Sequence, residues 1–80
     1  MTNALQVPEE LISQVHTKIH FANAGDVAYD ELSYLIRNAD ISDYTKGYLY
    51  GRLDDMDSRY EDRSLYHAFY GLLIGLSLNE

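Results

Sequence analysis

Residues 59–78 read RYEDRSLYHAFYGLLIGLSL, and this stretch decides the fold. From Leu65 to Leu78, apolar side chains occur on nearly every side of a helix, which is typical of a helix buried over most of its surface. The apolar run is about 14 residues long and is interrupted by polar groups, whereas a membrane span needs roughly 20 residues. We therefore expect a C-terminal helix from about Arg59 to Leu78 that lies at the centre of a small helical domain.

A first helix is expected to begin at Pro8, because proline loses nothing at the first helical position and two glutamates follow it. Gly25 is a candidate for ending this helix, since glycine readily adopts the left-handed conformation found just beyond many helices. The apolar residues that recur at helical spacing between them are Leu11, Val15, Ile19 and Ala22. This segment should pack one apolar side against the rest of the protein.

Two more helices are expected in the middle of the chain. Asp26 is a candidate cap for a helix that ends near Asn38, and Ser42 is a candidate first residue of the next helix. The apolar stripe of the earlier segment is Leu32, Leu35, Ile36 and Ala39, and the inward residues of the later segment are Leu49, Leu53 and Met56.

The joint before the last helix is less sharply marked. Residues 58–61, SRYE, fit a capping box, in which a serine hydroxyl and a glutamate carboxylate satisfy backbone N–H groups at a helix start. Residues 54–62 lack glycine and proline, however, so the last two helices could also be continuous. No segment alternates usefully with period two. The prediction is an all-α fold, a single domain spanning residues 1–80 with three to four helices and the C-terminal helix central.

The composition limits the classes of function. The chain has 80 residues, no cysteine, and 13 acidic against 6 basic residues, which gives a net charge of −7. Direct binding to a nucleic-acid backbone is not expected, because phosphate contact depends on clustered lysine and arginine. The acidic surface either keeps a small protein in solution or docks on a basic partner. The absence of cysteine and of a signal-peptide pattern favours a cytoplasmic location without membrane contact.

Four glycines in helical segments need an explanation, because each weakens a helix by about 1 kcal/mol relative to alanine. In the C-terminal helix, small residues fall within about 60° of one another and form a stripe. The members of this small-residue stripe are Ser64, Ala68, Gly71 and Gly75. Such a stripe permits close approach of another backbone, either within the chain or across a homodimer seam.

The other two glycines lie on the side of the third helix that faces away from its apolar residues. They share this side with aspartates and tyrosines, and tyrosine is frequent at interface hot spots. We call this set the acidic tyrosine face; its residues are Tyr44, Gly47, Tyr48, Gly51, Asp54, Asp55, Asp57 and Ser58. Such a face suits arginine and lysine through ion pairs and ring–cation contacts, although a neighbouring helix of the same chain could also cover it.

Motifs for chemistry are weak. His16 and His20 are spaced i, i+4 and could hold a metal, but residues 16–20 read HTKIH and lack the glutamate of HExxH, so surface histidines are expected. Asp55-x-Asp57 begins like a calcium loop but continues with Arg59, where an oxygen ligand is needed. With no paired nucleophile and base and no phosphate loop, we expect neither an enzyme nor a metal or cofactor.

Residues 41–45, ISDYT, open a helix in a small acidic chain, and this start resembles that of the colicin nuclease immunity proteins. The resemblance implies a small all-helical inhibitor that presents acids and tyrosines to a nuclease. The family's D-x-I-Y-Y-P motif is absent, so none of its binding residues carries over.

Together these patterns predict a non-enzymatic protein that acts by protein–protein interaction. The expected role is an inhibitor or modulator that docks its acidic tyrosine face on the basic surface of a nucleic-acid-handling partner. Small phage and plasmid anti-restriction, anti-CRISPR and immunity-type inhibitors work this way as a class, as nucleic-acid mimics. The alternatives are a homo-oligomeric structural module that packs through its glycines, a small accessory subunit, or a metal binder through His16 and His20.

Overall fold

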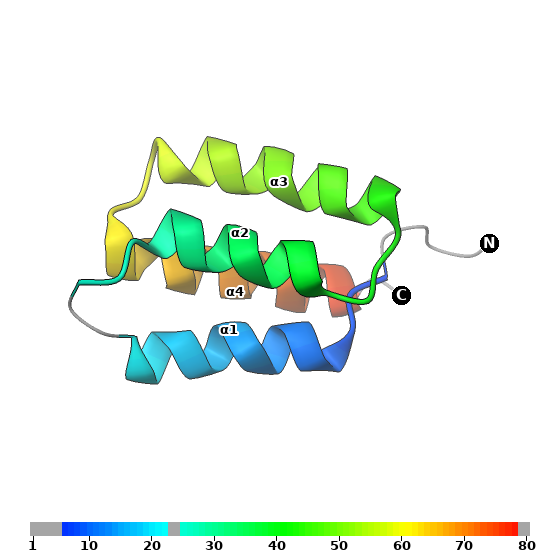
Figure 1. Cartoon of the computed structure of the whole chain (residues 1–80), viewed down its shortest axis with the longest axis horizontal. Helices are drawn as coiled ribbons and strands as arrows, with labels where there is room; N and C mark the ends of the chain where they lie inside the picture. The colour runs from blue at the N-terminus through cyan, green and yellow to red at the C-terminus, as the bar shows by residue number, and fades with distance from the viewer. Residues whose placement is uncertain (1–5, 23–24, 79–80) are drawn as a thin grey trace.

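Every regular element in the described part of the chain is a helix. The computed structural model describes residues 6–22 and 25–78. The helices are α1 (Glu9–Phe21), α2 (Ala28–Asn38), α3 (Asp43–Asp57) and α4 (Asp62–Leu78), as Figure 1 shows. The predicted all-α fold is confirmed, and α3 and α4 are separate helices.

Two helices share the centre of the bundle. In Figure 1, α1 and α3 lie on opposite sides, with α2 and α4 between them. Both α2 and α4 contact each of the other three helices, whereas α1 and α3 do not pack on each other within the described residues. The prediction of a central C-terminal helix is therefore correct, but α2 holds an equivalent place.

All four helices and the segment before α1 contribute to one hydrophobic core. Phe69 and Leu73 of α4 are completely buried, and so are the predicted inward residues Leu49 and Leu53 of α3. The remaining core residues are Val7, Leu11, Val15, Ala28, Leu32, Ile36, Met56, Leu65 and Tyr66. Because the predicted stripes supply most of these residues, helical periodicity located the core correctly.

One side of α4 is not covered by the bundle. His67, Gly71 and Gly75 are exposed, and Leu78 at the end of the helix is 79% exposed. The prediction that α4 is buried on nearly every side was wrong, because glycine and histidine gain little from burial while the larger apolar residues gather on the other side. The exposed side of α4 runs the length of the helix.

Neither end of α1 lies where the sequence predicted it. Pro8 is the N-cap in extended conformation, so α1 begins at Glu9, one residue later than expected, and the Pro8 carbonyl accepts a hydrogen bond from the Leu11 N–H at 3.1 Å. The helix ends at Phe21, with an extended Ala22 as C-cap. Gly25 does not end it, and no described glycine has a positive φ.

The cap of α2 was also predicted wrongly, whereas that of α3 was predicted correctly. Val27, not Asp26, is the N-cap of α2, and it makes no side-chain cap hydrogen bond. The helix ends at Asn38, as expected. Ser42 is the N-cap of α3, where its Oγ accepts a hydrogen bond from the Thr45 N–H at 3.1 Å. This is the arrangement that the sequence pattern predicts.

Residues 58–60 end α3, whereas the Glu61 carbonyl accepts a hydrogen bond from the Leu65 N–H at 2.8 Å and so belongs to the start of α4. Ser58 is the C-cap of α3, and its Oγ donates a hydrogen bond to the Asp55 carbonyl at 2.7 Å. The N–H groups of Arg59 and Tyr60 both donate to the Met56 carbonyl at 2.9 Å. The capping-box prediction was therefore wrong, since Ser58, Arg59 and Tyr60 satisfy carbonyls at the end of α3, and α4 begins at Asp62, four residues after Ser58.

One ion pair joins the first two helices. The Lys18 ammonium of α1 donates a hydrogen bond to the Glu31 carboxylate of α2. This bond raises the pKa of Lys18 above its ordinary value, although partial burial of the amine acts in the opposite direction. The pair connects α1 and α2 at the edge of the core.

Candidate protein-binding face

The acidic tyrosine face lies on the side of α3 that points away from the core. The buried side of α3 consists of Thr45, Leu49, Leu53 and Met56. Of the eight residues of the face, seven are exposed and Tyr48 is half-buried. A Cβ built at Gly47 or Gly51 would meet no atom within 4 Å. No neighbouring helix of the described chain therefore covers this face, which removes one of the two explanations for its glycines.

The face extends along almost the whole of α3. Tyr44 near the start of α3 is 68% exposed, and Ser58 caps its end. At 1.5 Å per residue the two lie about 21 Å apart along the helix. The hydroxyl of Ser58 is engaged with the backbone of its own helix, so the polar groups directed outward are carboxylates and tyrosine hydroxyls.

Asp54 connects this face to α2. The Tyr29 hydroxyl of α2 donates a hydrogen bond to Asp54 Oδ1 at 2.5 Å. This bond raises the pKa of Tyr29 above its ordinary value, and burial of the phenol adds to the effect. Sequence reasoning missed Tyr29 as a neighbour of the face, because helical periodicity gives no information about the register between two helices.

The negative charges of Asp55 and Asp57 differ in whether a basic side chain lies beside them. Asp55 forms an i, i+4 ion pair with Arg59, with 3.4 Å between Oδ1 and the guanidinium, and both side chains are more than half exposed. Within the described residues, the Asp57 carboxylate has no hydrogen-bond or ion-pair partner. The last turn of α3 contains no basic residue. Three carboxylates therefore lie at the negative end of this helix dipole, where positive charge is favoured.

The small-residue stripe of α4 is also uncovered. Ser64, Gly71 and Gly75 are exposed, and Ala68 is half-buried against the core. A Cβ at either glycine would meet no atom within 4 Å. None of the described helices therefore packs against the stripe, and the homodimer seam stays a prediction.

The predicted histidine pair is brought together on the exposed side of α1. The ring centroids of His16 and His20 are 4.7 Å apart, and the ring of His16 lies 5.4 Å from that of Tyr70 on α4. No group of three or more metal-ligating side chains occurs among residues 6–22 and 25–78.

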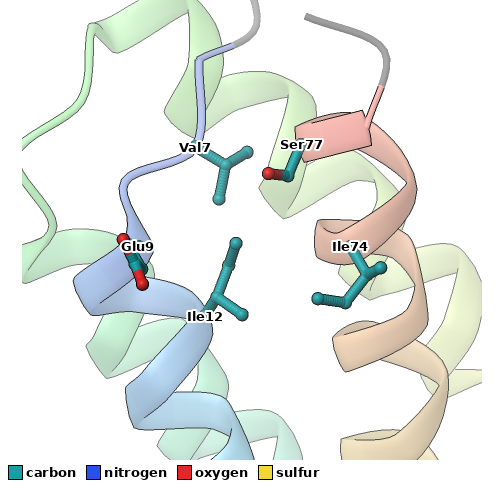
Figure 2. A pocket seen from close by; sticks show the side chains of 5 residues that line it. All are labelled: Val7, Glu9, Ile12, Ile74 and Ser77. Atoms are coloured by element: carbon teal, nitrogen blue, oxygen red, sulfur yellow. The ribbon is translucent and has the colours of Figure 1, made fainter.

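A surface pocket of about 460 Å³ lies between the start of α1 and the end of α4. Figure 2 shows Val7, Ile12 and Ile74 around it, with Glu9 and Ser77 as its polar groups. Val7 and Ile12 stand at the N′ and N4 positions of α1, the pair of positions that forms a hydrophobic staple. The apolar lining of the pocket is thus explained by the staple at the start of α1. The pocket lies on α1 and α4, whereas the acidic tyrosine face lies on α3.

No protein-family model, curated protein or solved structure matches this chain. The resemblance to immunity proteins therefore rests on residues 41–45 alone. None of the described helices has the length and apolar character required to cross a membrane.

Proposed function

We propose that this protein acts by binding another protein through the acidic tyrosine face of α3. The partner has a basic surface of the kind that nucleic-acid-handling enzymes use to hold phosphates. The protein inhibits or modulates this partner by occupying that surface as a nucleic-acid mimic.

The observation that carries the proposal is the placement of charge in the last turn of α3. Asp54, Asp55 and Asp57 are all exposed, and they lie at the helix end where a negative charge lowers stability. Among the residues that the structure describes, no hydrogen bond or ion pair to the exposed Asp57 carboxylate offsets this cost. Residues that reduce stability at an exposed position are frequent at functional sites, because function and not stability retains them.

The rest of the face supports the same partner chemistry. Tyr44 offers an exposed aromatic ring to a lysine or arginine, which a ring attracts at about 0.5–1 kcal/mol when exposed and about 2 kcal/mol when desolvated. Gly47 and Gly51 leave room for an incoming side chain or backbone next to that ring. The aspartates supply ion pairs that steer association and fix register.

The test is capture from a lysate of the host, at low and at high salt, with identification of the captured protein. The test variant replaces Asp54, Asp55 and Asp57 by asparagine. A matched control removes three exposed charges elsewhere, by replacing Glu9 and Glu10 by glutamine and Asp40 by asparagine.

We expect a basic partner that the wild type and the control variant capture at low salt and that the test variant loses. Equal capture by both variants would contradict the proposal, because net charge and not this face would then determine binding. Failure to capture any basic protein would also contradict it.

A second candidate function is self-association through α4. The observation that favours it is the absence of acidic residues from Arg63 to Leu78, in a chain whose net charge is −7. Two copies would repel each other least at this surface, and the open space at Gly71 would admit a second helix. Light scattering of the wild type and of Gly71→Leu tests it: a dimer that becomes a folded monomer supports this candidate, and a wild-type monomer excludes it.

A further inference from the structure

We infer that His16 and His20 form a two-histidine site for a divalent transition-metal ion such as Zn²⁺, Ni²⁺ or Cu²⁺. The two residues are one turn apart on α1, so that both side chains project from the same side of the helix. Both are exposed, and an ion can reach them without any change in the core. The site is on the helix that does not pack on α3, and it is independent of the proposed function.

The inference rests on the i, i+4 spacing and the exposure of both imidazoles, and the separation of the two rings is compatible with a shared ion. Zinc lies about 2.0–2.1 Å from a ligating imidazole nitrogen, which places it about 3.2 Å from the ring centroid. Two rings that share one ion at an angle between 90° and the tetrahedral value then have centroids about 4.5–5.2 Å apart. The observed separation of 4.7 Å lies within this range, and the planes are inclined by 65° rather than stacked.

Each histidine ring lies near a further aromatic ring. The His16 ring is 5.4 Å from the ring of Tyr70, which belongs to α4, and the His20 ring is 6.3 Å from that of Phe21. Tyr70 is half-buried, so that α4 supports His16 from the side of the core. Less ordering is then required when an ion binds, because the histidines are already close together.

The ligand chemistry defines which ions bind. Imidazole suits zinc, nickel and copper, whereas magnesium and calcium prefer the oxygen ligands that the aspartates of α3 offer. Two protein ligands supply roughly half of the binding free energy of a four-ligand zinc site, so a dissociation constant between about 1 µM and 1 mM is expected. Copper should bind more tightly than nickel or zinc. Water would complete the coordination.

The experiment is a titration of the whole chain with zinc sulfate, followed by NMR of the histidine rings and the backbone amides. We expect saturable shifts of His16 and His20 at one ion per chain, whereas the ring of His67 on α4 stays unchanged. Magnesium chloride at the same concentration should leave all three rings unchanged.

Variants separate this site from general attraction of cations to an acidic protein. His16→Ala and His20→Ala should each weaken zinc binding at least tenfold, whereas His67→Ala should not. Exchanging residues 20 and 21, as His20→Phe with Phe21→His, keeps the composition but moves the second imidazole off the shared side; it should also weaken binding at least tenfold.

Circular dichroism is the control for folding, and each variant should be folded because these side chains are exposed. Zinc shifts centred on the amides of Asp54 to Asp57, or binding that survives the exchange of residues 20 and 21, would overturn the inference. Absence of any ring shift at 1 mM zinc would overturn it as well.

Discussion

The dipole of α3 allows one substitution to be tested at both ends of the same helix. Asp57 is in the last turn and Asp43 in the first, and both are exposed. Asparagine and aspartate have similar helix propensities, so Asp→Asn mainly removes a charge. A charge near a helix end contributes about 0.3–1 kcal/mol, with opposite signs at the two ends. Asp57→Asn should therefore stabilise the fold by this amount, and Asp43→Asn should destabilise it by the same amount.

The assay is urea unfolding of the two variants and the wild type at pH 7 and low ionic strength. The free energies of unfolding of the two variants should differ by about 0.6–2 kcal/mol, which separates their melting temperatures by about 3–15 °C. In 1 M salt the Debye length is only about 3 Å, and the difference should shrink. A stability change of the same sign in both variants, or a loss of stability in Asp57→Asn, would refute the reasoning on which the proposed function depends.

Three further predictions concern other parts of the fold. Ser42→Ala removes the acceptor of the Thr45 N–H and should lower the free energy of unfolding by about 1 kcal/mol in urea titrations, whereas Ser42→Asp should largely retain it. Gly71→Ala should raise the melting temperature by several degrees, about 1 kcal/mol, because a Cβ there meets no atom within 4 Å; a decrease would show a covered position. Because the pKa of Lys18 is raised above 10.5, its pair with Glu31 stabilises the fold below that pH and loses its effect as the pH rises through the folded value. Glu31→Gln should lower the free energy of unfolding at pH 8 by up to about 1 kcal/mol. The free energy of unfolding should also fall less between pH 8 and pH 11 in this variant than in the wild type, and an unchanged pH profile would contradict this.

The sequence predicts the core well and the helix ends less well. Leu49 and Leu53 are buried as expected, because the periodicity of apolar residues depends only on the geometry of one helix. Ser42 was identified because its side chain bonds a backbone group three residues away. The roles of Gly25 and Ser58 were predicted wrongly. Glycine and serine both occur at helix starts, at helix ends and in loops, and which of these forms depends on how the neighbouring helices pack.

The candidate site could be predicted in part. The outward position of Asp54, Asp55 and Asp57 follows from the angle of 100° per residue, and the structure places all three on the exposed surface. The hydrogen bond from Tyr29 to Asp54 could not be predicted, because it depends on how α2 is placed along α3. The closeness of the histidine rings follows from their spacing, whereas the support from Tyr70 depends on the packing of α4 on α1.

Because α1 and α3 lie on opposite sides of the bundle, amino-acid substitutions on their outer surfaces should act independently of each other. Side chains on the outer surfaces of these two helices share no contacts, so the effects of substitutions on them should add within about 0.3–0.5 kcal/mol. Selection can therefore change one surface without readjusting the other. A chain of only 80 residues can in this way vary two exterior surfaces separately, while the inward side chains of all four helices keep the core constant.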